Sequence, residues 1–108
     1  MMSGMIAVEM KCVGPDHFEG ELGVGDKHER VVHLHFNGVD NGLVQLWQRY
    51  GWGKNPCGHG SLTRVGEGWW GLIEDTVHQE AWTVNGEDFV DGTLLFVPAA
   101  ASVRSKRR

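Results

Sequence analysis

Two short segments hold the side chains that are best suited to chemistry. His33 and His35 lie two residues apart in VVHLHF, and Cys57 and His59 lie two residues apart in the loop GWGKNPCGHG. Zinc, iron and copper bind imidazole and thiolate groups in proteins. Residues i and i+2 of a β-strand lie on one face about 7 Å apart, so both strand histidines can face one ion. The main prediction is a protein without a cofactor, and the alternative is a metal site formed by His33, His35 and either Cys57 or His59, with Zn or Fe as the ion.

The histidine pair also resembles part of a known kind of site. His-x-His on a β-strand is similar to the start of the metal site in the small β-barrel metalloenzymes of the cupin type. This resemblance implies an open metal position at which a bound water or substrate is activated. The chain departs from that pattern because no Glu follows at the expected place and no second histidine motif has the family's spacing. A small cupin-like metal-dependent β-barrel protein is therefore the alternative function, and a solvated strand face is the plainer explanation of the two histidines.

Aromatic and basic side chains are concentrated in the same loop and just before it. Trp52 lies among turn-forming residues that give it little to pack against, and the adjacent Trp69 and Trp70 must place their rings on opposite faces of a strand. Trp and Tyr are enriched where proteins contact their partners. We therefore expect a non-catalytic accessory or structural domain that binds another protein, or a second copy of itself, through this loop and a sheet face. The residues assigned to this partner-binding surface are Arg49, Tyr50, Trp52, Lys54 and Trp69.

Catalytic patterns are weak along the chain. Ser61 follows His59 and Gly60, but it lacks the second glycine of the Gly-x-Ser-x-Gly turn that exposes a nucleophilic serine. Glu74 and Asp75 are neighbours in a predicted strand, so their carboxylates point to opposite faces and cannot act as a pair. We therefore assign no catalytic residue, and the sequence favours a binding protein over an enzyme.

The composition and the periodicity of the apolar residues predict a β fold. Glycine accounts for 16 of the 108 residues, and glycine is costly inside helices but useful in turns and bulges. Apolar and polar residues alternate in segments separated by turn-forming residues, at 5–13, 17–24, 29–36, 61–65, 69–77, 79–84 and 89–97. We therefore predict one compact domain over 1–98, mainly β, built as a small antiparallel β-sandwich or barrel of about seven short strands.

The segment at about 42–50 is ambiguous. Leu43, Leu46, Trp47 and Tyr50 fall at i, i+3, i+4 and i+7, which is the apolar stripe of a short helix. The same residues could instead form one arm of a hairpin after an Asn-Gly turn. The prediction is at most one short helix, placed in this segment.

Charge is spread unevenly along the chain. The last ten residues, 99–108, form a basic tail, and the rest of the chain carries six of the ten basic residues against fourteen acidic ones. An acidic surface repels phosphate backbones, so nucleic acid is expected at most as a weak contact of the tail. The basic residues of that tail are Arg104, Lys106, Arg107 and Arg108.

Targeting and membrane signals are absent from the sequence given. No signal peptide is visible at its start, and its apolar runs are shorter than the ~18–20 residues of a membrane span. We therefore expect no membrane contact, a cytoplasmic or otherwise intracellular location, and reduced thiols at Cys12 and Cys57.

Overall fold

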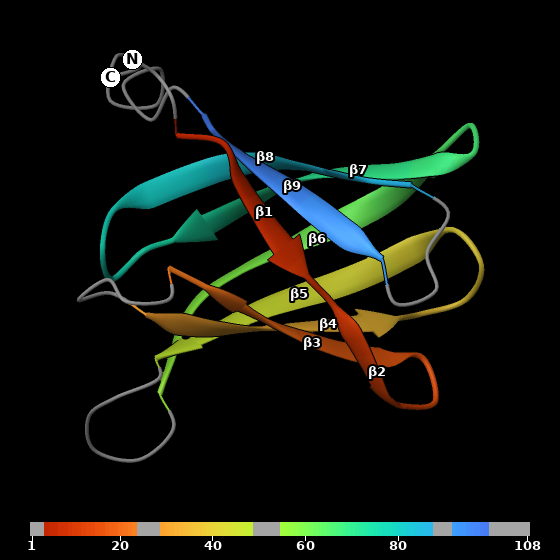
Figure 1. Cartoon of the computed structure of the whole chain (residues 1–108), viewed down its shortest axis with the longest axis horizontal. Coiled ribbons are helices and arrows are strands. Elements are labelled where there is room, and N and C mark those ends of the chain that lie inside the picture. The colour runs from red at the N-terminus through yellow and green to blue at the C-terminus, as the bar shows by residue number, and fades with distance from the viewer. Residues whose placement is uncertain (1–3, 24–28, 49–54, 88–91, 100–108) are drawn as a thin grey trace.

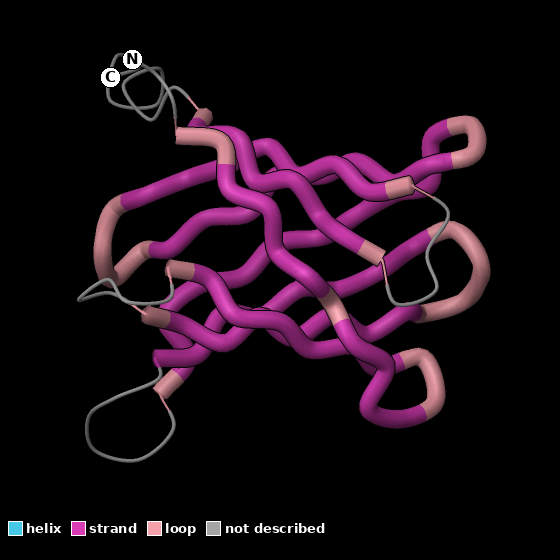
Figure 2. The backbone as a smooth tube through the Cα atoms, in the orientation of Figure 1, coloured by secondary structure: helices cyan, strands magenta, loops and turns pink. Residues whose placement is uncertain are grey.

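The fold is a single antiparallel β-sheet that curls into a nearly closed barrel (Figure 1). The computed structural model describes residues 4–23, 29–48, 55–87 and 92–99. Strands account for most of this described part, which contains no helix (Figure 2). The nine strands are β1 (Ile6–Glu9), β2 (Lys11–Gly14), β3 (His17–Leu22), β4 (Arg30–Phe36), β5 (Asn41–Gln48), β6 (Pro56–Val65), β7 (Gly68–Asp75), β8 (Glu80–Gly86) and β9 (Thr93–Pro98). The expected mainly β, barrel-like class is confirmed, with nine strands in place of about seven.

The two N-terminal strands close the sheet. The strand order is β1-β9-β8-β7-β6-β5-β4-β3-β2, so β1 and β2 lie at opposite edges although only Met10 separates them in the chain. The backbone N–H of Met10 itself donates to the carbonyl of Gly92 at 2.9 Å. One continuous segment therefore pairs with β9 in its first half and with β3 in its second half. This bridging covers both sheet edges, which would otherwise expose unpaired backbone groups.

Side-chain alternation along the strands separates a packed interior from an outer face. In β3, β4 and β5 the even-numbered positions point inward, as shown by the buried Phe18, Leu34 and Val44. The odd-numbered positions of these strands therefore face outward. The interior is filled by apolar side chains from eight of the nine strands and by Met10: Val8, Met10, Phe18, Leu22, Val32, Leu34, Val44, Leu46, Cys57, Leu62, Trp69, Ile73, Ala81, Trp82, Val84, Leu94 and Phe96.

Close packing at the seam depends on one glycine. A Cβ atom added to Gly20 of β3 would lie 2.6 Å from the carbonyl oxygen of Glu9 and 2.6 Å from the sulfur of Met10. Any larger residue would push the closing segment away from β3, because Cβ atoms do not approach other heavy atoms so closely. Because Gly20 has no side chain, Glu9 and Met10 can lie directly against β3.

The short helix expected at about 42–50 is wrong for the described residues of that segment. Residues 41–48 form β5, which pairs with β4 on one side and with β6 on the other. Gly42, Val44 and Leu46 are buried while Leu43 is exposed, so period-two burial outweighed the helical stripe. Two neighbouring strands satisfy the backbone of β5 on both edges, which a short isolated helix could not match.

Candidate metal centre

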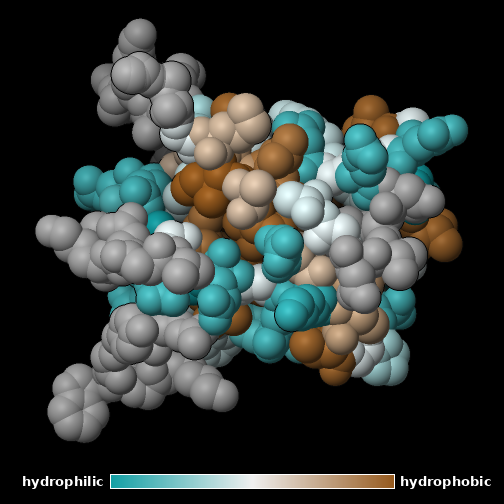
Figure 3. Space-filling model, in the orientation of Figure 1, coloured by the Kyte–Doolittle hydropathy of each residue, from teal (hydrophilic) through white to brown (hydrophobic). Residues whose placement is uncertain are grey.

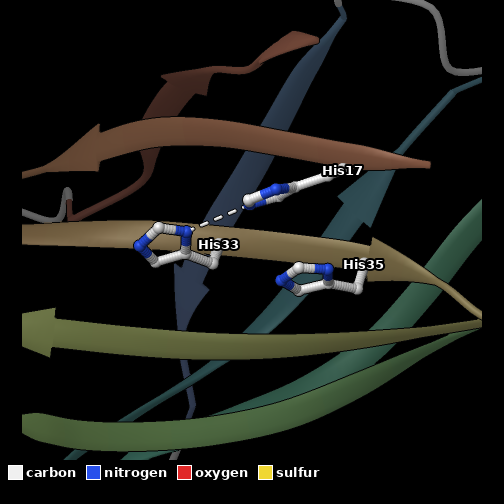
Figure 4. Close-up of side chains that lie close together, drawn as sticks. All are labelled: His17, His33 and His35. Atoms are coloured by element: carbon white, nitrogen blue, oxygen red, sulfur yellow. Dashed lines mark hydrogen bonds between the residues drawn. The ribbon is translucent and has the colours of Figure 1, made fainter. Parts of the chain in front are cut away.

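Three histidines lie together on the outer face of the β3–β4 hairpin (Figure 4). His17 is the first residue of β3, and His33 and His35 lie in β4. His17 is the direct cross-strand partner of His35. Directly opposed residues of antiparallel strands have Cβ atoms about 4.5–5.5 Å apart. Strand pairing therefore brings three imidazoles from two segments of the chain to one place.

The ring positions suit a small ion. His17 Nε2 lies 3.2 Å from His33 Nδ1, and the rings of His17 and His35 stack with centroids 4.0 Å apart. One nitrogen of each ring falls within 4.8 Å of the other two. Two imidazole nitrogens bound to one tetrahedral zinc lie about 3.3–3.4 Å apart, because each Zn–N bond is about 2.0–2.1 Å. The pair of His17 and His33 is close to this spacing, and the nitrogen of His35 lies within 4.8 Å of both.

The surroundings of this histidine cluster are negatively charged. The cluster lies in a groove on the outer surface of β1 to β5. The charged side chains among the described lining residues are three carboxylates, Glu9, Glu19 and Glu21, and one ammonium, Lys11. An excess of carboxylates raises the local concentration of cations. The electrostatics of the groove therefore favour a bound cation over a bound anion.

A second group of potential ligands lies inside the barrel. Cys57, Asp75 and His78 also offer donor atoms within 4.8 Å of one another. Asp75 accepts hydrogen bonds from the backbone N–H of His78 at 2.8 Å and from Nη1 of Arg30 at 2.7 Å. Nη1 of Arg30 also donates to Glu80 Oε1 at 2.6 Å. This inner polar cluster thus already contains a cation, the guanidinium of Arg30.

The pKa values of the inner polar cluster oppose metal binding. Burial raises the pKa of the Cys57 thiol to about 12, and the negative charge of Asp75 adds to this rise. Burial alone would also raise the pKa of Asp75, but hydrogen bonds from His78 and Arg30 outweigh it and lower that pKa. Arg30 behaves in a parallel way, since its pKa is raised by Glu80 and Asp75 despite the opposing effect of burial. Without a metal ion, the cluster is therefore a neutral thiol beside the ion pair of Arg30 and Asp75, and an incoming cation would compete with Arg30 for the carboxylate.

The four residues proposed as metal ligands from the sequence do not converge. His33 and His35 join the histidine cluster, but Cys57 points into the interior and is only 2% exposed. His59 is on the outer face of β6, where it pairs with Gln45, the residue that pairs with His33 on the other side. Two strand spacings of about 4.8 Å therefore separate His59 from His33. The third imidazole beside His33 and His35 is that of His17.

The sequence contained a signal for His17 that the analysis of spacing along the chain missed. The predicted turn Gly25-Asp26-Lys27 lies between the two predicted strands at 17–24 and 29–36. His17 and His35 are equally far from Asp26 in the sequence, so a hairpin centred there pairs them. A search for cross-strand partners would have found the third histidine.

The residues assigned to partner binding fall into two groups. Arg49, Tyr50, Trp52 and Lys54 lie outside the described residues. Trp69 is buried at 5% exposure, and its neighbour Trp70 is 47% exposed on the outer face of β7. Trp69 points inward and Trp70 outward because successive side chains of a strand alternate between its two faces. In the interior, Trp69 packs against Phe36 with ring centroids 4.8 Å apart. A contact surface on this strand would therefore use Trp70 in place of Trp69.

The fold and the site together describe a nearly closed antiparallel barrel with a histidine cluster on its outer surface. No family model matches the chain, and neither a curated protein nor a solved structure matches it. No helix in the described part of the chain is long and apolar enough to cross a membrane. Function is therefore inferred from the chemistry of the side chains.

Proposed function

We propose that this protein binds a transition-metal ion, of the Zn or Fe kind, through His17, His33 and His35. The observation that carries the proposal is the convergence of three imidazoles, with one nitrogen of each within 4.8 Å of the others. His33 and His35 retain the role expected from their spacing in the sequence. His17 takes the place of Cys57 and His59.

The contrast with the inner polar cluster supports this choice. The outer histidines are partly or fully exposed, and three carboxylates and one ammonium line their groove. The inner cluster holds a buried guanidinium and a thiol whose pKa is about 12. Metal ligation requires deprotonated ligands that an ion can reach. Of the two groups, the outer one is the one that an ion can reach from solvent.

Native mass spectrometry of the untagged protein, before and after chelation, tests the proposal. We expect one Zn²⁺ per chain after reconstitution, removed by chelator, and no bound ion in a His33→Ala/His35→Ala double variant. His59→Ala is the matched control, because His59 is an exposed histidine on the same face of the sheet but outside the cluster. A bare mass for the wild type under saturating Zn²⁺ would overturn the proposal. Equal Zn²⁺ content in the double variant would do the same.

A second candidate function is self-association through an apolar part of the outer face. Leu43, Trp70, Leu72 and Leu95 are large apolar side chains with 38–53% of their surface exposed. Leu43 lies on β5, Trp70 and Leu72 lie on β7, and Leu95 lies on β9. A separate view, Figure 3, shows apolar side chains gathered over β1 and β9. A two-fold contact between copies would cover such a surface with itself. This agrees with the binding and assembly role expected from the sequence, with Trp70 as its described aromatic residue.

Sedimentation of the wild type and of a Leu72→Ser variant tests the second candidate. We expect a dimer that Leu72→Ser shifts toward monomer. Val39→Ser serves as control, since Val39 is also highly exposed but lies in the turn between β4 and β5. A monomeric wild type at high concentration would exclude self-association through this surface.

A further inference from the structure

The histidine cluster forms three corners of a four-residue array, and the fourth corner is Glu19. His17 and Glu19 are consecutive outward residues of β3, and His35 and His33 are their direct partners on β4. The array therefore consists of two opposed pairs, His17 with His35 and Glu19 with His33. Opposed residues and i, i+2 neighbours on one face are all within reach of a common central ion. We propose that Glu19 is the fourth protein ligand of the metal, an inference that rests on the proposed metal-binding function.

The position of the Glu19 carboxylate distinguishes a ligand from a supporting residue. Glu19 Oε2 lies 3.4 Å from His33 Nδ1, the same ring atom that lies 3.2 Å from His17 Nε2. A carboxylate that only orients a metal-bound histidine contacts the ring nitrogen that does not bind the metal. Glu19 instead lies on the side of His33 that faces His17. Its carboxylate therefore lies beside the nitrogen pair of His17 and His33, outside the group of donor atoms within 4.8 Å of one another, and would turn inward to bind the ion.

Exposure is consistent with a ligand that turns toward an incoming ion. The side chain of Glu19 is 41% exposed and that of His33 is 22% exposed, so both reach solvent from the groove. The cross-strand partner of Glu19 on its other side is Lys11 of β2. Glu19 therefore lies between an ammonium group and an imidazole, and a divalent cation would give the carboxylate a stronger partner than either.

The ligand set of three imidazoles and one carboxylate selects a class of metal. Soft Cu(I) is favoured by thiolate and thioether ligands, and Ca²⁺ and Mg²⁺ are favoured by oxygen ligands alone. Imidazole nitrogen with one carboxylate oxygen suits borderline divalent ions such as Zn²⁺ and Fe²⁺. With Zn²⁺ bound, one carboxylate leaves a single net positive charge on the site. The array therefore favours Zn²⁺ or Fe²⁺ over Cu(I), Ca²⁺ and Mg²⁺.

Zn²⁺ affinity and Co²⁺ absorption of Glu19→Gln test the assignment. Glu21→Gln is the matched control, because Glu21 is the next outward residue of β3 and loses the same charge, but its partner on β4 is Val31. We expect Glu19→Gln to weaken Zn²⁺ binding by at least about 10–100-fold, because the loss of a residue that only hydrogen-bonds to a metal ligand already costs that much affinity. We also expect the visible bands of bound Co²⁺ to change in Glu19→Gln alone.

Each outcome decides between the two proposals. A wild type without metal affinity would remove both the proposed function and the role of Glu19. Unchanged affinity and an unchanged Co²⁺ spectrum in Glu19→Gln would overturn the role of Glu19 and leave the three-histidine site in place. Weaker binding with an unchanged Co²⁺ spectrum would also overturn the assignment as a ligand, because it would place Glu19 outside the coordination shell. Equal losses in Glu19→Gln and Glu21→Gln would show a general effect of charge.

Discussion

The barrel contains two groups of three potential metal ligands, and they differ in charge and in access. The histidine cluster lies in an outer groove whose charged lining is mainly carboxylate. The inner polar cluster has equally close donor atoms, but Arg30 at 3% exposure and Asp75 at 1% already neutralise each other there. Donor atoms in close proximity are therefore not sufficient for a metal site. We therefore expect the charge that is already present to decide which group receives an ion.

The inner polar cluster has a structural role that its connections make clear. Arg30 belongs to β4 and Asp75 to β7, and two strands separate β4 from β7 in the sheet. Arg30 also reaches Glu80 at the start of β8 and lies over the ring of Trp82 at 5.3 Å. The ion pair therefore links, through the interior, two strands that are not neighbours in the sheet. Removing one partner would leave the other charge buried without compensation.

The largest expected effect is the loss of this internal ion pair. Arg30→Met should lower the free energy of unfolding by about 3–5 kcal/mol, the usual cost of breaking a buried pair. Urea denaturation followed by tryptophan fluorescence measures the change. The control is Arg64→Met, since Arg64 is only half-buried over Trp69 at 4.7 Å and should contribute about 0.5–1 kcal/mol. Similar losses of unfolding free energy in both variants would show that the buried ion pair of Arg30 contributes no more than the half-buried Arg64.

The next effect is metal-dependent stability, which should belong to the outer cluster alone. Zn²⁺ at a free concentration 100 times its Kd should raise the free energy of unfolding by about 2.7 kcal/mol. The gain should persist in Cys57→Ala and disappear in His33→Ala/His35→Ala, as measured by urea denaturation with and without the ion. The reverse pattern would move the metal site to the inner polar cluster.

A smaller effect is expected in acid. Because the folded pKa of Asp75 is lowered, its contribution to stability is fully present above the unfolded pKa of about 3.9 and is lost as the pH falls through the folded pKa. The difference in unfolding free energy between wild type and Asp75→Asn should therefore shrink below about pH 4. Urea midpoints across the acid range measure this difference. A constant difference would show that Asp75 is not held ionised by its partners.

The smallest perturbation is thiol labelling, which compares an exposed cysteine with the cysteine of the inner polar cluster and changes no residue. Cys12 is exposed and in no disulfide, whereas Cys57 is buried and has a pKa of about 12. An alkylating reagent at about pH 8 should modify Cys12 quickly and Cys57 only after unfolding, because the thiolate is the reactive form. Peptide mass spectrometry identifies the modified site. Fast modification of Cys57 in the native state would contradict its enclosed position.

Much of the fold follows from local patterns in the sequence. Alternation predicted the strands around Phe18 and Leu34, and the interior faces of both segments are buried as expected. The same criterion failed at 42–48 because Leu43, Leu46 and Trp47 fit a helical stripe as well as a strand. Backbone pairing with β4 and β6 decided that segment, and such pairing is not visible in a window of eight residues.

Only the part of the candidate site that lies on a single strand could be predicted from the sequence. The spacing of His33 and His35 is a property of one strand, so it could be found along the chain. His17 required the register of a hairpin, and the pair of Arg30 and Asp75 required closure of the whole barrel. Cys57 and His59 do not both face His33 and His35, because the register of β6 shifts opposite Leu46 and Trp47, so that Cys57 is buried while His59 is exposed. Spacing along the chain could not predict the contacts that depend on pairing between distant segments.

The splitting of the first strand between both edges of the sheet sets an order for folding. Ile6 pairs with Phe96, so the barrel cannot close until β9 has left the ribosome, although β3, β4 and β5 can pair as soon as they are made. Contacts between residues so far apart in sequence slow folding, because the entropy of closing the chain is lost before the contact is gained. Until that final pairing, the nascent chain presents the free edges of β2 and of the most recently synthesised strand. Slow closure and a dependence on dilute conditions during refolding are therefore consequences of where β1 and β2 are placed.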